Sequence, residues 1–218
     1  MLGVGNNDAP ILPAGWERSP SLEAERDEAR QLIAEVFGGR PLWGWKDPRN
    51  SITLPFWQRL LPPMRYVICV RNPVDMAASA ATFAAERGVT PDRQRAFALW
   101  ECYIANALVN TSGSPRLIVA YEDYFGDWLG AANRLARFAG LDALDGTAGA
   151  QEVRDLLDRG HRHHRSPADE VAHDPDLPAG TRLLYRALRD DPGDAELDRL
   201  AHRLLEGRAR TDLDSARA

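Results

Sequence analysis

Cysteine is scarce in this chain: its 218 residues contain only Cys69 and Cys102, at unrelated positions. Two isolated cysteines make neither a disulfide framework nor a zinc site. Each lies in an apolar stretch, so we expect both to be core thiols in a reducing compartment. No apolar run approaches the roughly 20 residues of a membrane span, and the N-terminus lacks the layout of a signal peptide. The sequence therefore predicts a cytoplasmic protein without a membrane partner.

An excess of positive charge is also missing. The formal net charge is −5, whereas a general nucleic-acid binder normally carries a basic face. We therefore expect no nucleic-acid partner, and any anionic ligand must be met by local cations. A length of 218 residues with 44% hydrophobic content fits one domain, or one domain with an appendage.

Along the chain, segments whose apolar residues have the pattern of strands alternate with segments whose apolar residues have the spacing of helices. Runs rich in aromatic and β-branched residues predict buried strands at 41–45, 65–70 and 116–121. Helical spacing predicts helices over 19–39, 73–87, 91–110 and 127–141. Strands separated by helices predict a parallel sheet covered on both faces, so the fold class is α/β.

The pattern changes beyond residue 145, where we expect helices only. The segments 151–158 and 181–190 have helical spacing, and a polar, histidine-rich loop joins them. We expect one α/β domain over residues 1–190, followed at 191–218 by a charged helix and tail. The last residues, "RTDLDSARA" from Arg210, are expected to be frayed.

The stretch "VICVRNPVDMAAS" places Arg71 where an apolar strand ends. Asn72 is a good helix cap and Pro73 suits the first helical position. A helix N-terminus beside a guanidinium favours a phosphate, and Ser79 could offer a hydroxyl from two turns along. The alternative is that Arg71 pairs with a neighbouring carboxylate and Ser79 packs as a small residue.

The stretch "RNPVDMAAS" resembles the 3′-phosphate-binding motif of sulfotransferases that use 3′-phosphoadenosine 5′-phosphosulfate, and Arg71 and Ser79 match its two phosphate contacts. "PLWGWKDPRNSITLPFW" and "LIVAYEDYFGDWLGAANRLARFAGL" are similar to flanking family segments, and Tyr121 matches a tyrosine that reaches the adenine. The similarity runs from about residue 16 to 190. It implies a P-loop-NTPase-like parallel sheet flanked by helices, this nucleotide as co-substrate, no metal, and a small-molecule or glycan acceptor.

One family feature is missing from the 218 residues. Members open with a strand and a glycine-rich loop that holds the 5′-phosphosulfate, but Gly3 and Gly5 have neither the preceding strand nor the following Lys/Arg-Ser/Thr. We expect the first central strand of the sheet to be missing and sulfate transfer by this chain alone to be negligible. Exposed strand edges would then favour self-association into a homo-oligomer.

The turn "KDPR" follows the expected strand at 41–45, and in the family it lies near the sulfuryl group. Lys46 suits a cation that stabilises developing charge, and Asp47 is a candidate base. Many animal members place a histidine where this chain has Pro48, so a carboxylate from outside the chain is an equal candidate. We assign Arg49 to the co-substrate; alternatively, Asp47 and Arg49 simply close a turn together.

The stretch "HRHHR" clusters imidazoles at His161, His163 and His164. Its spacing fits no helical metal site, so we expect no metal there. The related enzymes cover the 3′-phosphate with an arginine-rich loop, and Arg162 and Arg165 are therefore assigned to the nucleotide. The alternative is a solvated loop.

Three hypotheses follow for the whole chain. The first is sulfuryl transfer to a hydroxyl or amine acceptor. The second is a non-catalytic or regulatory module that keeps the 3′-phosphate site alone. The third is a small-molecule kinase, which requires a Walker-type loop and Mg²⁺ carboxylates that the sequence lacks.

Overall fold

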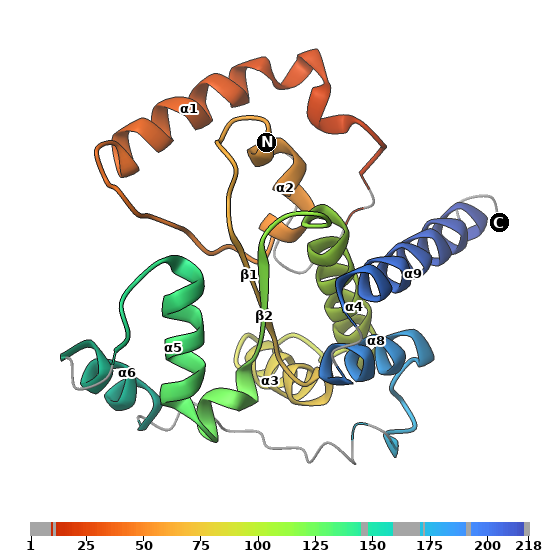
Figure 1. Cartoon of the computed structure of the whole chain (residues 1–218). Coiled ribbons are helices and arrows are strands. Elements are labelled where there is room, and N and C mark those ends of the chain that lie inside the picture. Colours follow the sequence, from red (N-terminus) through yellow and green to blue (C-terminus); the bar gives the residue numbers. More distant parts are fainter. Residues whose placement is uncertain are drawn as a thin grey trace.

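The computed structural model describes Pro10, residues 12–144, 148–158, Val171, and residues 173–190 and 193–215. Two strands and a larger set of helices make up these residues (Figure 1). The strands are β1 (Tyr66–Val70) and β2 (Arg116–Ala120). The α-helices are α1 (Glu23–Phe37), α2 (Asn50–Gln58), α3 (Pro73–Ala85), α4 (Arg93–Asn110), α5 (Trp128–Ala139), α6 (Ala148–Asp158), α8 (Ala179–Asp190) and α9 (Asp194–Ser215). Three short 3₁₀ helices are η1 (Trp16–Arg18), η2 (Pro20–Leu22) and η3 (Tyr121–Phe125).

The sheet is parallel and, within the described residues, has two strands. Its register runs from the pair Tyr66 and Arg116 to the pair Val70 and Ala120, and α3 and α4 form the crossover. The protein is therefore a mostly helical α/β fold with a small parallel sheet flanked by helices, which confirms the expected class. Helix α4 lies on one side of the strands and α5 on the other (Figure 1).

The prediction of a strand at 41–45 is wrong, because this segment has no regular secondary structure. Its two tryptophans are engaged in ring stacking instead of lying beside another strand. The Trp43 ring stacks on Phe37 at 4.2 Å between centroids and on Trp45 at 5.7 Å, and Trp45 meets Trp57 edge-on at 5.5 Å. The buried strand expected here would have placed Trp45 in the core, but Trp45 is 36% exposed. An apolar run predicts burial only if a neighbouring element covers it.

Helix α4 is the centre of the core. The predicted stripe Phe97, Trp100, Ile104 and Leu108 is buried, and it packs with residues of β1, α8 and α9 in one cluster. Helix α9 contributes Leu197, Leu200 and Ala201 to this cluster. The helix continues to Ser215, into the segment from Arg210 that we expected to be frayed.

A buried arginine joins β2 to α9. The Arg116 side chain is 2% exposed, and its guanidinium lies 2.8 Å from Asp194 and 2.7 Å from Asp198. It also donates to the carbonyl of Leu108 at 3.0 Å. The start of β2, the end of α4 and the first turns of α9 are therefore held together by one side chain.

Helix α2 was not predicted, because Pro55 lies inside it. Proline has no N–H, so the carbonyl four residues earlier loses its helical partner. That carbonyl belongs to Ser51, and it accepts a hydrogen bond from the Asn110 side chain at 2.7 Å. Gln58 in turn donates to the Asn110 carbonyl at 2.7 Å. The end of α4 thus compensates for the proline in α2.

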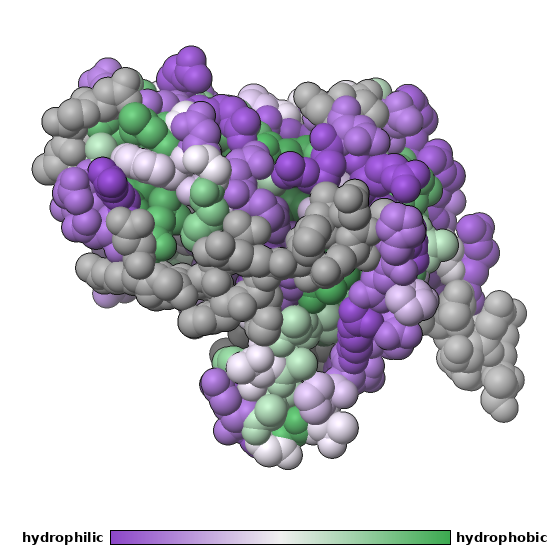
Figure 2. Space-filling model, turned by 90° about the horizontal axis from the view of Figure 1, so that it is seen from below, coloured by the Kyte–Doolittle hydropathy of each residue, from purple (hydrophilic) through white to green (hydrophobic). Residues whose placement is uncertain are grey.

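One face of β1 is uncovered, contrary to the expectation of a sheet covered on both sides. Ile68 and Val70 are buried, but Val67 is 42% exposed and Cys69 is also exposed. Of the two expected core thiols, only Cys102 is buried. Helices α3 and α4 cover one face of β1, whereas α5 contacts β2. Figure 2, seen from below, shows apolar surface beside strongly hydrophilic surface.

Candidate functional site

The corner after β1 has the local structure that its sequence predicts. Asn72 caps α3: its side-chain oxygen accepts from the N–H of Val74 at 2.8 Å and from that of Asp75 at 3.4 Å. Pro73 is the first helical residue. The proline fixes the backbone for the first turn and the cap satisfies two of its donors. Arg71 therefore stands at the carboxyl end of a strand, directly before a helix N-terminus.

The Arg71 guanidinium lies on an aromatic ring. Its central carbon is 5.1 Å from the centroid of the Tyr121 ring, a cation–π distance. Its Nε is buried and has no hydrogen-bond partner among the described residues. Within that part of the chain Arg71 forms no ion pair with a carboxylate. A buried cationic donor without a partner is costly unless a ligand satisfies it.

A cavity of about 2060 Å³ opens beside the exposed face of β1. It brings together four of the predicted site residues: Lys46, Asp47, Arg71 and Ser79. Tyr121 and Arg49 do not line it, although Tyr121 contacts Arg71. The remaining wall is mainly apolar and includes Val67, Cys69, Met76, Ala80, Phe83, Leu99 and Tyr103. An apolar wall with a few polar groups has the composition of a small-molecule site, but the volume exceeds the roughly 300–1,000 Å³ usual for one, so a single ligand would occupy only part of this cavity.

Lys46 acts electrostatically on the β1 face of this cavity. Although the Cys69 side chain is reached by solvent, the surrounding protein atoms partly desolvate its thiol and raise its pKa, and the positive charge of Lys46 acts in the opposite direction. Cys69 comes two residues before Arg71 on β1. Lys46 and Arg71 therefore approach the same strand end from separate elements, and both are cations.

Asp47 and Arg49 form an ion pair, which was the alternative left open by the sequence. The two Arg49 side-chain donors lie 2.9 and 2.6 Å from the Asp47 carboxylate oxygens, and the Arg49 N–H donates to one of these oxygens at 2.8 Å. This pairing lowers the pKa of Asp47 to about 2, chiefly through the side-chain hydrogen bond from Arg49. Asp47 is therefore ionised at neutral pH and is a weak proton acceptor.

We expect Arg49→Ala to raise the pKa of Asp47 from about 2 toward its ordinary value of 3.8. Since the pKa is lowered in the folded chain, the pair stabilises the fold at neutral pH, and this contribution is lost as the pH falls through about 4 toward 2. A carboxyl ¹³C NMR titration measures the pKa directly. Arg59→Ala, at an exposed arginine without a contact to Asp47, is the control. An unchanged Asp47 pKa in Arg49→Ala would contradict the assignment.

Two residues of the corner were not identified from the sequence: Trp100 and Glu122. The Trp100 indole N–H donates to the Arg71 carbonyl at 2.8 Å, and a Glu122 carboxylate oxygen accepts from the Asn72 N–H at 2.8 Å. The other Glu122 oxygen is buried without a hydrogen-bond partner in the described part of the chain. The only available signal for Glu122 was its position next to Tyr121 in "YED".

Tyr185 of α8 lies close to the same carboxylate. Burial, followed by the negative charge of Glu122, raises the pKa of Tyr185 to about 12. Its ring meets that of Trp100 edge-on at 6.2 Å. Helix α8 therefore packs against the residues that hold the Arg71 corner.

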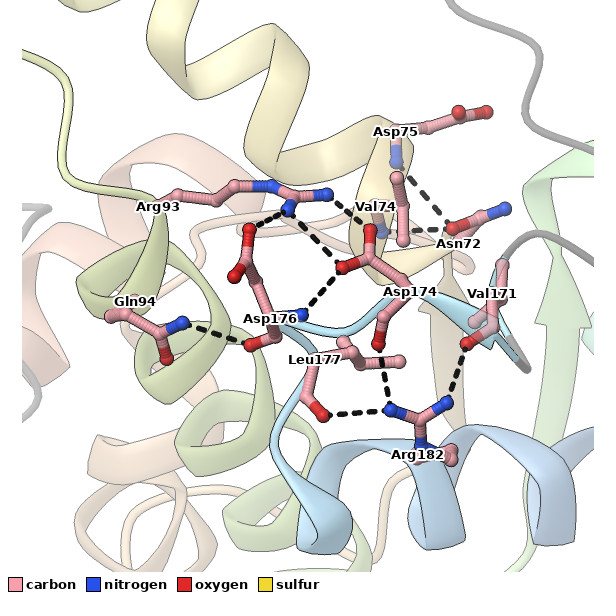
Figure 3. A network of polar contacts seen from close by, with 10 residues as sticks. All are labelled: Asn72, Val74, Asp75, Arg93, Gln94, Val171, Asp174, Asp176, Leu177 and Arg182. Carbon is pink, nitrogen blue, oxygen red and sulfur yellow. Dashed lines mark hydrogen bonds and ion pairs between the residues drawn. The ribbon is translucent and has the colours of Figure 1, made fainter.

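The predicted contacts Arg162 and Arg165, with the histidine cluster around them, lie outside the described residues. The chain is described again at Val171, which is buried in the core, and over residues 173–190. Arg93 at the start of α4 forms ion pairs with Asp174 and Asp176, and Arg182 of α8 donates to backbone carbonyls of the same segment (Figure 3). Both helices thus hold the segment that follows the predicted basic loop.

The model of the sulfotransferase family matches residues 14–145, more than half of the chain. The chain therefore belongs to the sulfotransferase family, which confirms the resemblance found in its motifs. This membership indicates sulfuryl transfer as the class of reaction. No curated protein and no solved structure matches the chain.

Among the helices described, none has both the length and the apolar character needed to cross a bilayer. In the same residues, no three His, Cys, Asp or Glu side chains gather into a group that could hold a metal ion.

Proposed function

We propose that this chain binds 3′-phosphoadenosine 5′-phosphosulfate and that its family reaction is sulfuryl transfer to a hydroxyl or amine acceptor. Arg71 carries the proposal, because at a strand end beside a helix N-terminus it presents a buried cationic donor that has no partner among the described residues. The Arg71 guanidinium would bind the 3′-phosphate, with Ser79 of α3 adding a hydroxyl from the same cavity. The α3 N-terminus would contribute only the positive end of its dipole, because the N–H groups of Asn72, Val74 and Asp75 already donate to protein oxygens.

Lys46 is the residue proposed for the reacting end. The nucleotide supplies the activated sulfuryl group, and negative charge grows on the oxygens around it during transfer. Lys46 lines the cavity and approaches the β1 end independently of Arg71. Its ammonium group would offset that charge, as a cation does in phosphoryl transfer. Arg49 would act indirectly, since its guanidinium is engaged by Asp47.

A binding module without transfer activity is the second candidate. The observation that favours it is the low pKa of Asp47, because this carboxylate was the base candidate within the chain. A base supplied from outside the chain would restore the first candidate. A small-molecule or glycan acceptor is part of the first proposal only.

Titration calorimetry with adenosine 3′,5′-bisphosphate, adenosine 5′-phosphate and ATP tests the proposal. We expect the bisphosphate to bind most tightly. A preference for ATP with Mg²⁺ would contradict the proposal and favour a kinase. A radiolabelled-sulfate assay with phenol, sugar and amine acceptors then separates an enzyme from a binding module.

Ser79→Ala is expected to weaken binding of adenosine 3′,5′-bisphosphate by about 0.5–1.5 kcal/mol, or roughly 2- to 13-fold, because one neutral hydroxyl donor is lost. Calorimetry measures the change. Thr82→Ala is the matched control, since the Thr82 hydroxyl on the same helix donates to the Ala78 carbonyl at 3.2 Å. Equal losses in the two variants would remove Ser79 from the proposed site.

A further inference from the structure

The peptide group between Arg71 and Asn72 is held at both ends by side chains. Its C=O accepts from the Trp100 indole at 2.8 Å, and its N–H donates to Glu122 at 2.8 Å. This peptide joins the last residues of β1 to the first of α3, so neither the strand ladder nor the helix satisfies it. Two residues from distant parts of the chain supply both partners. We call this arrangement the 71–72 clamp.

The two clamp side chains come from elements that contact the corner in other ways as well. Trp100 is 5% exposed and lies in the core cluster, where its ring meets Tyr185. Glu122 belongs to η3, directly after β2. Its neighbour Tyr121 carries the Arg71 guanidinium on its ring. Helix η3 therefore contacts the corner twice, through the Arg71 side chain and through the following peptide.

The conformation at this peptide determines how the Arg71 guanidinium and the α3 N-terminus are oriented relative to each other. The two hydrogen bonds fix the plane of the 71–72 peptide, and with it ψ of Arg71 and φ of Asn72. An uncompensated change in either angle turns α3 relative to β1, and therefore moves the α3 N-terminus relative to the Arg71 guanidinium. Sites that bind a charged group depend on such alignment, and a misplacement of about 1 Å is costly.

We propose that Trp100 and Glu122 are positioning residues, which hold the 71–72 peptide so that the Arg71 guanidinium and the α3 N-terminus face the same phosphate. The inference rests on the proposed function for the identity of the ligand, a nucleotide 3′-phosphate. Neither residue touches that phosphate in this account. Their effect on binding acts through Arg71 and Asn72.

The test compares the ratio of the dissociation constants for adenosine 5′-phosphate and adenosine 3′,5′-bisphosphate in four variants. Glu122→Leu and Trp100→Phe each remove one clamp hydrogen bond, and we expect the ratio to fall roughly 5- to 20-fold in each. Glu122→Gln keeps an acceptor oxygen and should keep the wild-type ratio. Glu101→Leu is the control, because Glu101 is a partly buried carboxylate that accepts a hydrogen bond from Thr181 at 3.0 Å and does not bond to the 71–72 peptide.

A purely structural role predicts a different result. It would lower thermal stability and weaken both nucleotides equally, so that the ratio in Glu122→Leu matches that in Glu101→Leu. That outcome overturns the inference. The ratio is insensitive to a general loss of folded protein, since both ligands report on the same folded fraction.

Amide hydrogen exchange at Asn72, followed by NMR without any nucleotide, tests the clamp independently of the proposed function. We expect slow exchange in the wild type and in Glu122→Gln, and faster exchange in Glu122→Leu. Equal exchange in all three overturns the clamp. A wild-type chain with no preference for the bisphosphate would instead refute the proposed function, and the exchange rates would still decide whether Glu122 holds the peptide.

Discussion

Arg71→Ala is expected to weaken binding of adenosine 3′,5′-bisphosphate by about 1.5–3 kcal/mol, or roughly 10- to 150-fold. The expected loss is large because the guanidinium would make charge-assisted bonds to the phosphate, and no residue in the described part of the chain offers its buried Nε another partner. Adenosine 5′-phosphate, which lacks the 3′ group, should bind nearly as well to the variant as to the wild type. Calorimetric titration of both nucleotides measures the difference.

The matched control is Arg87→Ala. Arg87 also lines the cavity, but it is exposed and lies over the Phe83 ring, with a hydrogen bond to the Phe83 carbonyl at 3.1 Å. Removal of Arg87 changes the charge by the same amount with little expected effect on either nucleotide. If Arg71→Ala weakens both nucleotides equally, the specific 3′-phosphate contact is disproved.

Arg116→Ala should lower the free energy of unfolding by about 2–4 kcal/mol. The guanidinium bonds to Asp194, Asp198 and the Leu108 carbonyl, and its side chain is 2% exposed. Loss of one member of a fully buried pair costs about 3–5 kcal/mol. The value expected here is lower, because Asp194 is 71% exposed and remains hydrated. Urea denaturation followed by tryptophan fluorescence measures the change.

An exposed ion pair provides the comparison for Arg116. Arg30 and Asp27 on α1 lie 2.6 Å apart with side chains 52% and 63% exposed. Pairs of this kind contribute only about 0–1 kcal/mol, so Arg30→Ala should change stability little. Equal stability of the Arg116→Ala chain and the wild type would show that α9 is not held through β2.

The elements whose signals are local were predictable from sequence. Asn72 and Pro73 set the start of α3 without help from the rest of the chain, and a cap with a first-turn proline is a short-range pattern. The stripe of α4 from Phe97 to Leu108 has the period of a buried helix, and it is buried.

The elements that depend on distant partners were not predictable. Helix α2 contains Pro55, and the carbonyl that this proline leaves free is satisfied by Asn110 from α4. The segment 41–45 has strand-like composition, but a strand requires a neighbour, and Trp43 and Trp45 stack on other rings instead. In both cases the deciding contact is made by a residue that no local pattern identifies.

The residues of the candidate site also fall into two groups: those that a local sequence pattern identifies and those that depend on distant contacts. Arg71 and Ser79 were found through one short motif, and both line the cavity. The pairing of Asp47 with Arg49 was visible as an alternative, because the two residues are close in sequence. Trp100 and Glu122 were missed because their bonds to the corner span 29 and 50 residues.

The ion pairs of Arg116 also determine when, during its synthesis, the protein can complete its fold. Asp198 follows Arg116 by 82 residues, so at roughly 5–20 residues per second a ribosome takes about 4–16 s to make the partner. During that interval β1, α4 and β2 have been synthesised, but the arginine has no α9 carboxylate and the core lacks Leu197 and Ala201. Completion of the C-terminal helix, and not synthesis of the sheet, therefore sets the moment at which the nascent chain can close its core.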